Sequence, residues 1–192
     1  MTRNLFDLPP GLPVPVDDGA CGHLPGLAVP SVRLRTTGGR WIDLREQSGR
    51  PTIVFVYPRT GEPDMPAPAD WDLIPGARGC TPQSCGFRDL FDDFQRLGFD
   101  VFGASSQTTD YQQEFVRRTR MPFEFLSDEE ARLAAALRLP SFEYAGERLL
   151  KRLALVFNEG RIVHVFYPVF PPDKNAQTVL SWIRNHFAQE RR

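Results

Sequence analysis

Two cysteines separated by five positions are the residues of this chain best suited to chemistry. Cys80 and Cys85 lie within the string GCTPQSCGFRD, residues 79–89. Thr81 is a favourable N-cap and Pro82 a favourable first residue, so a helix is predicted to start there. The free N–H groups and the dipole of a helix N-terminus stabilise an anion. Cys80 is therefore predicted to be a nucleophilic thiolate.

The spacing of the two cysteines restricts how they react with each other. On an intact helix, five residues separate the Cα atoms by roughly 8–9 Å, whereas a disulfide tolerates at most about 7 Å. If the first turn unwinds, the pair bonds, because oxidised Cys80 then presents a sulfenic sulfur that Cys85 attacks. A single cysteine is most often buried and inert. The pair instead indicates catalysis, redox sensing or metal binding.

The elements that must position the pair alternate along the chain. Residues 52–57 are continuously apolar and β-branched, as is typical of a strand buried on both faces. Alternating strands and helices require a largely parallel sheet with helices on both faces, and a late antiparallel hairpin makes it mixed. The predicted fold class is α/β, a central mixed sheet flanked by helices, with an N-terminal β-hairpin extension. The predicted strands are 32–35, 40–44, 52–57, 100–104, 123–126, 151–157 and 161–167, and the predicted helices are 81–97, 110–119, 127–137 (with a Ser127–Glu130 capping box) and 175–189.

The chain is predicted to form one domain with an irregular beginning. Residues 1–30, rich in Pro and Gly, are expected to wrap the domain or to be partly mobile. Residues 31–192 make up the domain, since neither a repeat nor a second core is visible. Within it, residues 58–79 form an inserted loop with five prolines and three glycines. Loops this long are usually functional or disordered, and Trp71 is expected to cover the site or to anchor this loop.

Composition excludes several classes of protein. The chain has 192 residues, with 23 Lys and Arg against 24 Asp and Glu, a formal net charge of −1. This balance offers no basic field to nucleic acid or anionic lipid. No apolar run approaches the ~20 residues that a membrane span needs, and Asp7 and four early prolines interrupt any signal-peptide core. Three cysteines suit no secreted disulfide scaffold, so a cytoplasmic location is expected.

The cysteine string resembles the active-site motif of the peroxiredoxins, in their bacterioferritin-comigratory-protein or PrxQ subgroup of the AhpC/TSA superfamily. That motif reads Gly-Cys-Thr-x-x-x-Cys-x-(Phe/Leu)-Arg-Asp, and the likeness continues over most of the chain from about Val32. The resemblance implies a thioredoxin-like fold and a thiol peroxidase for hydrogen peroxide or organic hydroperoxides. Cys80 then corresponds to the peroxidatic cysteine and Cys85 to the resolving cysteine. It also implies no cofactor, a thioredoxin or glutaredoxin-like reductant, and a monomer or weak dimer.

Two further site residues follow from the same resemblance. Arg152 matches the family arginine that lies beside the thiolate and orients the peroxide, although sequence alone would rank Lys151 equally. The family also places a Thr or Ser three residues before the cysteine, where this chain has Ala77. Thr60, after Pro58 at the start of the long loop, is the candidate to fold back and supply this hydroxyl.

Two other functions compete with a peroxidase. A thiol–disulfide oxidoreductase would share the fold, but such proteins carry CxxC and a proline before the facing strand. Metal binding by Cys80, Cys85 and His164 would resemble the copper chaperones, whose usual spacing is CxxxC; His164 is expected to point to solvent or to pack at the surface. Cys21, in the Gly-rich lead-in, is expected to be an incidental exposed or half-buried thiol.

Overall fold

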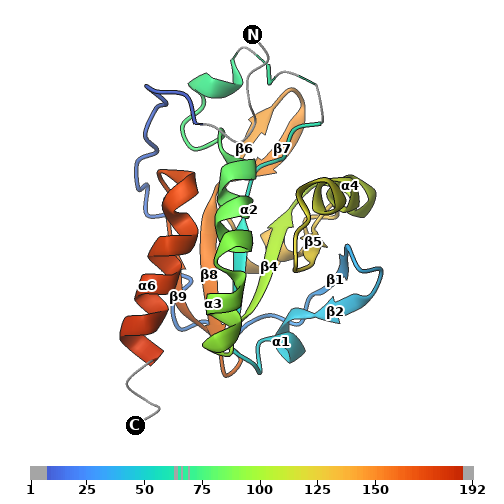
Figure 1. Cartoon of the computed structure of the whole chain (residues 1–192), viewed down its shortest axis with the longest axis vertical. Helices are drawn as coiled ribbons and strands as arrows, with labels where there is room; N and C mark the ends of the chain where they lie inside the picture. Colours follow the sequence, from blue (N-terminus) through green and yellow to red (C-terminus); the bar gives the residue numbers. More distant parts are fainter. Residues whose placement is uncertain (1–7, 63–64, 66, 69, 188–192) are drawn as a thin grey trace.

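The computed structural model describes residues 8–62, 65, 67–68 and 70–187, so the first residues of the predicted lead-in and the last two of the predicted final helix lie outside it. The described residues form a seven-stranded mixed sheet, in the order β2-β1-β5-β4-β3-β8-β9, with a separate β6-β7 hairpin (Figure 1). The strands are β1 (Arg33–Thr36), β2 (Trp41–Asp43), β3 (Thr52–Val56), β4 (Asp100–Ser105), β5 (Phe125–Ser127), β6 (Ser141–Tyr144), β7 (Glu147–Leu150), β8 (Leu153–Asn158) and β9 (Arg161–Phe166). The helices are α1 (Leu44–Gln47), α2 (Cys80–Asp89), α3 (Phe91–Arg96), α4 (Thr109–Thr119), α5 (Arg132–Leu137) and α6 (Asn175–Phe187), with 3-10 turns η1 (Trp71–Leu73) and η2 (Pro172–Lys174). The predicted mixed sheet flanked by helices is confirmed.

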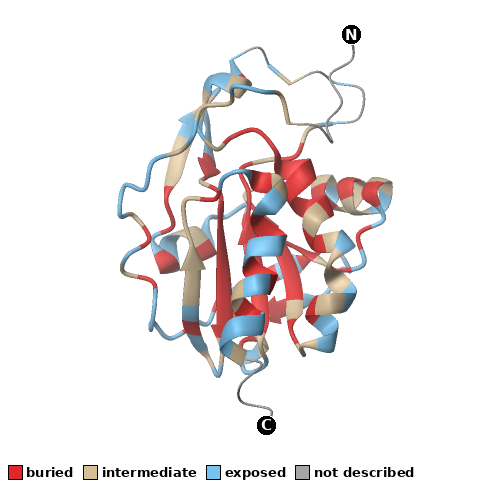
Figure 2. Cartoon of the chain, turned by 60° about the vertical axis from the view of Figure 1, so that its left-hand side comes forward, coloured by how far each residue is buried: buried red, intermediate tan, exposed pale blue. Residues whose placement is uncertain are grey.

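The central strand β3 is buried along its whole length, as its apolar sequence predicts (Figure 2). It pairs in parallel with β4 and antiparallel with β8. Because side chains alternate along a strand, Ile53 and Phe55 face one core and Val54 and Val56 face the other. The chain leaves β3 into the long loop that leads to Cys80, so the best-buried strand positions the site.

One face of the sheet carries α2, α3, α4 and α6 over an aromatic core. Phe55 of β3 stacks on Phe87 of α2, with ring centroids 4.3 Å apart and planes within 5°. Phe55 also meets Phe125 of β5 edge-on at 5.7 Å. Burial of a side chain such as Phe87, which is fully buried, contributes about 2 kcal/mol. These contacts fix the orientation of α2 on the sheet.

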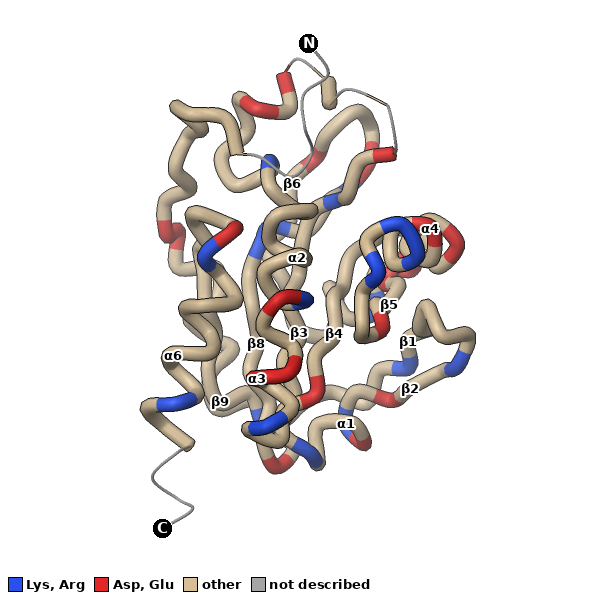
Figure 3. Tube along the Cα trace, in the orientation of Figure 1, with Lys and Arg blue, Asp and Glu red and all other residues tan. Residues whose placement is uncertain are grey.

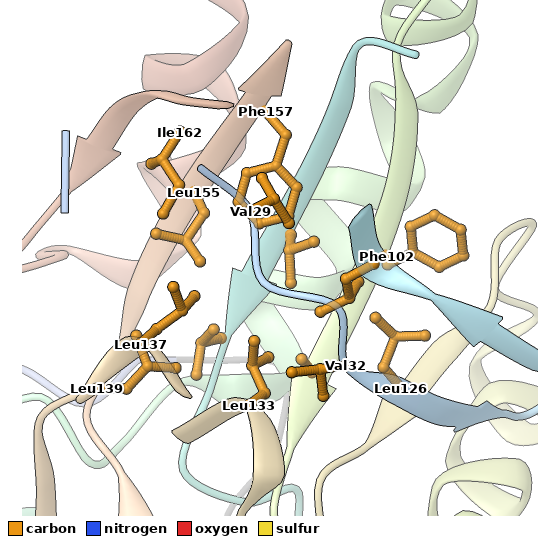
Figure 4. Close-up of a cluster of buried hydrophobic side chains, with 14 of the residues drawn as sticks. Val29, Val32, Phe102, Leu126, Leu133, Leu137, Leu139, Leu155, Phe157 and Ile162 are labelled. Carbon is orange, nitrogen blue, oxygen red and sulfur yellow. The ribbon is translucent and has the colours of Figure 1, made fainter. Parts of the chain in front are cut away.

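The opposite face is covered by α5 and by the lead-in (Figure 4). Leu24 and Val29 are fully buried there, and Ala28 bridges to Arg161 of the edge strand β9. Residues 8–30 therefore wrap the domain. Cys21 is 6% exposed in this core; the expectation of an exposed or half-buried thiol was wrong because the lead-in is itself a layer of the fold.

The helix that carries the cysteines differs from its prediction at both ends. It begins at Cys80, with Gly79 at the N-cap position in a left-handed conformation (φ 102°) and without a side-chain cap. Thr81 is consequently inside the helix, and the prediction that it is the N-cap is wrong. The predicted 81–97 helix is also divided in two at Leu90, whose backbone (φ −106°, ψ 9°) departs from helical geometry.

Two more local predictions need correction. The proposed capping box of α5 does not form, because the Asp128 carboxylate accepts hydrogen bonds from the N–H groups of Leu133 and Ala134 instead. The β6-β7 hairpin was not predicted, since its strands lack regular alternation. Its turn passes through Ala145 and Gly146, both at positive φ, and no Asn-Gly or Asp-Gly signal marks it.

Charges of both signs are scattered along the described chain, as the near-zero net charge leads one to expect (Figure 3). No helix in the described ranges is long and apolar enough to cross a bilayer.

Candidate active site

Cys80 is the first residue of α2, a helix that packs against η2. Its side chain is 4% exposed. The preceding Gly79 has room for no side chain, because a Cβ there would collide with Pro172 and Leu8. A glycine is thus needed both for its left-handed backbone and for this close approach. The result is a cysteine held where the free N–H groups of a ten-residue helix begin.

The guanidinium of Arg152 lies directly beside the Cys80 sulfur. Arg152 immediately precedes β8 and is 3% exposed. Its Nη2 donates a hydrogen bond to Cys80 Sγ at 3.2 Å. The same guanidinium donates to the carbonyls of residues 76, 77 and 78 at 3.0–3.2 Å. A permanently charged donor fixed in this way favours a negative charge on the sulfur.

Two buried amides hold that guanidinium in place. Arg152 Nη1 donates a short hydrogen bond to Gln83 Oε1. Gln83 Nε2 in turn donates to Asn175 Oδ1 at 2.9 Å. Gln83 is fully buried and Asn175, at the start of α6, is 3% exposed. The relay therefore links α6, α2 and the strand β8 around the Cys80 sulfur.

At Ala77, where the family has a hydroxyl, the backbone carbonyl rather than a side chain contacts the Cys80 sulfur. The Cys80 S–H points to the Ala77 carbonyl oxygen at 3.7 Å. Thr60, 1% exposed, lines the same cleft as Cys80, but its hydroxyl donates to Gln107 Oε1 at 3.1 Å. Gln107 also accepts from the Thr60 N–H and donates to its carbonyl, which fixes this turn of the loop.

A cleft of about 500 Å³ opens at Cys80 between the long loop and the β6-β7 hairpin. The hairpin lies beyond the N-terminal end of α2 (Figure 1). Trp71 of the loop is 5% exposed and packs edge-on against Tyr144 of the hairpin, with centroids 5.0 Å apart. Trp71 thus anchors the loop, which is one of the two roles expected of it, and it also lines the cleft.

Cys85 lies five residues, about 1.4 turns, further along α2 in the aromatic core. It is 8% exposed, and burial raises the pKa of its thiol. None of Cys80, Cys85 and Cys21 forms a disulfide in this structure. Because α2 is continuous from Cys80 to Asp89, the two site cysteines cannot bond in this conformation, and local unwinding is required.

The three candidate metal ligands, Cys80, Cys85 and His164, do not form a cluster. The His164 ring stacks on the Trp182 ring, with centroids 4.4 Å apart. The pKa of the His164 imidazole is lowered mainly by burial and, to a smaller extent, by the charge of His186. Within the part of the chain that the structure describes, no group of three or more His, Cys, Asp or Glu side chains could hold a metal ion.

Sequence reasoning missed the two amides of the relay. Gln83 lies three residues after Cys80, hence on the same helical face, and this spacing was a usable signal. Asn175 is 92 positions from Gln83, and nothing in the sequence associates them.

The chain is similar in sequence to a known family and to several curated proteins. The family described as Redoxin matches residues 24–180. Among curated proteins, the chain is 27% identical over 166 residues to the chloroplastic Peroxiredoxin Q of Oryza sativa subsp. japonica (86% of this chain, 69% of the relative). It is 26% identical over 165 residues to Peroxiredoxin Bcp of Escherichia coli K12 (84% and 96%).

Solved structures share the fold. Peroxidoxin BcpB from Mycobacterium tuberculosis superposes with a TM-score of 0.70 at 24% identity, covering 85% of this chain and 99% of that one. A cysteine-to-serine mutant of PrxQ from Xylella fastidiosa also gives 0.70, at 19% identity (85% and 98%). The family match spans most of the chain and includes both site cysteines. The chain therefore belongs to the redoxin family, as a peroxiredoxin of the PrxQ and Bcp group.

Proposed function

We propose that this peroxiredoxin reduces hydrogen peroxide and organic hydroperoxides with Cys80 as the nucleophile. The observation that carries the proposal is the hydrogen bond from Arg152 to the Cys80 sulfur at the N-terminus of α2. Both features stabilise a thiolate, and the arginine also offers donors to the oxygen on which charge develops.

In the first step the Cys80 thiolate attacks the terminal oxygen of a peroxide ROOH. A sulfur–oxygen bond forms as the oxygen–oxygen bond breaks, so Cys80 is oxidised to a sulfenic acid and the peroxide is reduced. The leaving RO⁻ takes a proton from solvent to become an alcohol, or water when R is hydrogen. Arg152 stabilises the charge as it moves from sulfur to oxygen.

In the second step Cys85 resolves the sulfenic acid. The first turns of α2 unwind, Cys85 leaves the core and loses its proton, and its sulfur attacks the Cys80 sulfur. A disulfide forms and hydroxide leaves as water. While α2 is folded, the raised pKa of Cys85 keeps it a protonated thiol. An external dithiol, a thioredoxin or glutaredoxin-like protein, then exchanges with the disulfide and is itself oxidised.

Thr60 is proposed to supply the hydroxyl that Ala77 lacks. Its proton is directed to Gln107, so the lone pairs of Thr60 Oγ1 remain able to accept a hydrogen bond from the peroxide O–H. Thr60→Val is expected to slow peroxide reduction much more than it lowers the melting temperature, while Thr60→Ser keeps the rate. Equal rates in both variants would exclude this role.

The remaining expectations are proposals of the same kind. We expect the enzyme to work in the cytoplasm, as a monomer or weak dimer. The thiol–disulfide oxidoreductase stays the competing function, because it would use the same two cysteines without a peroxide.

One titration tests the proposed function. One equivalent of hydrogen peroxide is added to the reduced protein, and free thiols and intact mass are followed. We expect the loss of two thiols and about 2 Da, no reaction in Cys80→Ser and a trapped sulfenic acid in Cys85→Ser. Cys21→Ser is the matched control and should behave as the wild type does. Slow oxidation that does not need Cys80 would overturn the peroxidase and favour the oxidoreductase.

A further inference from the structure

The wall of the Cys80 cleft carries a positively charged side chain that the proposed reaction does not use. Arg59, from the start of the long loop, lines the cleft together with Cys80 and Thr60. Its guanidinium lies 5.1 Å from the ring centroid of Trp71 and 5.4 Å from that of Tyr144. Two aromatic faces at these distances hold a guanidinium by cation–π attraction.

The Arg59 guanidinium keeps free hydrogen-bonding capacity with respect to the residues that the structure describes. Among the described residues its polar partner is Glu147, in an ion pair of 3.5 Å. The Arg59 side chain is 28% exposed and that of Glu147 is 64% exposed, so water screens this pair. A guanidinium has five N–H donors in a planar fork, and an ion pair this long satisfies few of them. The fork matches a carboxylate, which it binds through two parallel hydrogen bonds.

Other charged groups of the cleft do not offer such a site. Arg78 is 7% exposed and pairs with Asp72 at 3.6 Å. Glu62 and Glu147 are exposed. Arg59 is thus the partly exposed cation of the described cleft wall, and it lies against two aromatic rings.

The cleft wall has an apolar part as well as polar side chains such as Thr60 and Thr81. Trp71 and Leu149 are buried walls of the cleft, and Met65 is an exposed apolar side chain at its edge. A cleft of about 500 Å³ accommodates a molecule far larger than hydrogen peroxide, since it falls within the usual range of ligand pockets. The apolar part of the wall and the exposed cation suit a molecule with an apolar body and one anionic end.

We propose that Arg59 is a specificity residue that selects organic hydroperoxides carrying a carboxylate. The carboxylate binds the Arg59 fork, the apolar body lies on Trp71 and Leu149, and the hydroperoxide group reaches Cys80. This inference rests on the proposed peroxidase function and goes beyond it, because it names a substrate charge that the cysteine chemistry does not require.

The test compares an acid with its own ester. The 13-hydroperoxide of linoleic acid, its methyl ester and hydrogen peroxide are each mixed with the reduced full-length protein, below the concentration at which the lipids aggregate. The second-order rate constant of thiol loss is measured for each. We expect the acid to react about tenfold faster than the ester at low salt, as for one hydrogen-bonded charge pair. This ratio should shrink in high salt, because the site is partly exposed.

Variants locate the effect. Arg59→Met should bring the acid-to-ester ratio to about one, and Arg59→Lys should retain part of it because the charge remains without the fork. Glu147→Gln removes the competing carboxylate and should raise the ratio about twofold to threefold. Arg50→Met, which removes an arginine with a 74% exposed side chain outside this cleft, is the matched control and should leave the ratio unchanged.

The outcomes separate the two proposals. If the wild type reduces hydrogen peroxide rapidly but treats acid and ester alike, the selectivity is refuted and the peroxidase stands. If Arg59→Met keeps the wild-type ratio, another group binds the carboxylate and Arg59 is not the specificity residue. If none of the three peroxides is reduced through Cys80, the proposed function itself fails.

Discussion

Replacing Arg152 with methionine should slow the attack of Cys80 on peroxide by one to two orders of magnitude. The side chain would lose its donation to the Cys80 sulfur at 3.2 Å. A hydrogen bond to a charged group is worth about 1.5–3 kcal/mol. If that stabilisation serves the reacting sulfur and oxygen, its loss corresponds to about 10- to 150-fold in rate. Methionine has a similar length, so little volume changes.

The same substitution also destabilises the fold, and the assay must separate the two effects. Besides the sulfur, Arg152 satisfies the Gln83 side-chain oxygen and three backbone carbonyls. Each buried acceptor left unpaired costs about 1–3 kcal/mol. A marked fall in the melting temperature is therefore expected, and rates must be measured well below the transition of the variant. Arg152→Lys, which retains the charge but not the fork, should fall between the two proteins.

The measurement is the second-order rate constant for hydrogen peroxide from single-turnover thiol loss, together with the thiolate absorbance at 240 nm. Arg148→Met is the control, because Arg148 is an exposed arginine of β7, four residues earlier, that donates to Ser141. A folded Arg152→Met protein with the wild-type rate constant and the wild-type thiolate absorbance would refute this reasoning. Loss of rate in Arg148→Met as well would show that the effect is not local.

Three further predictions concern residues away from the reacting atoms. Asn175→Ala leaves the Gln83 amide without its acceptor. The rate constant for hydrogen peroxide should fall by about threefold to tenfold, and the thiolate absorbance should fall with it. Asn175→Asp should restore much of both quantities. The pKa of Asp18 is lowered to about 2 by hydrogen bonds from Lys151, Tyr167 and the Ala20 N–H. Asp18 therefore stabilises the fold above about pH 4, and this contribution is lost as the pH falls towards 2. In urea unfolding, Asp18→Asn should have a lower free energy of unfolding than the wild type at pH 7, and this difference should vanish near pH 2. Burial raises the pKa of the Cys21 thiol to about 12, and the charges of Asp18 and Asp17 add to this effect. Iodoacetamide at pH 8 should therefore label Cys21 in urea but not in the native protein. Labelling of the native protein, detected by mass spectrometry, would contradict the burial of Cys21.

The sequence predicted the framework well because its signals are local. The continuous apolar run of β3 identified the central strand, and the helical spacing of Phe87 and Phe94 identified a helix over the aromatic core. The cysteine string carried the family resemblance. Such features depend on side-chain type and spacing along one segment, which the sequence displays directly.

The predictions failed where distant segments decide local geometry. Thr81 is a good N-cap by type, but the helix starts earlier because Gly79 adopts a left-handed conformation beneath Pro172. Pro172 follows Gly79 by more than ninety positions, and no rule on caps includes such a contact. The β6-β7 hairpin was missed for a related reason, since its stability comes from Trp71 in the long loop rather than from its own alternation.

The relay through Gln83 also bears on how the proposed cycle proceeds. The first turn of α2 is held to β8 by Arg152 and to α6 by Asn175, so unwinding it must break both hydrogen bonds of the Gln83 amide. Conversion of a Cys80 thiolate to a neutral sulfenic acid removes the charge that strengthens the Arg152–sulfur hydrogen bond. Oxidation therefore weakens one of the contacts that keep α2 folded, at the moment when Cys85 must leave the core. Substitutions in the relay should affect both the rate of attack on peroxide and the rate of disulfide formation, whereas changes at Arg59 should affect only the attack on hydroperoxides that carry a carboxylate.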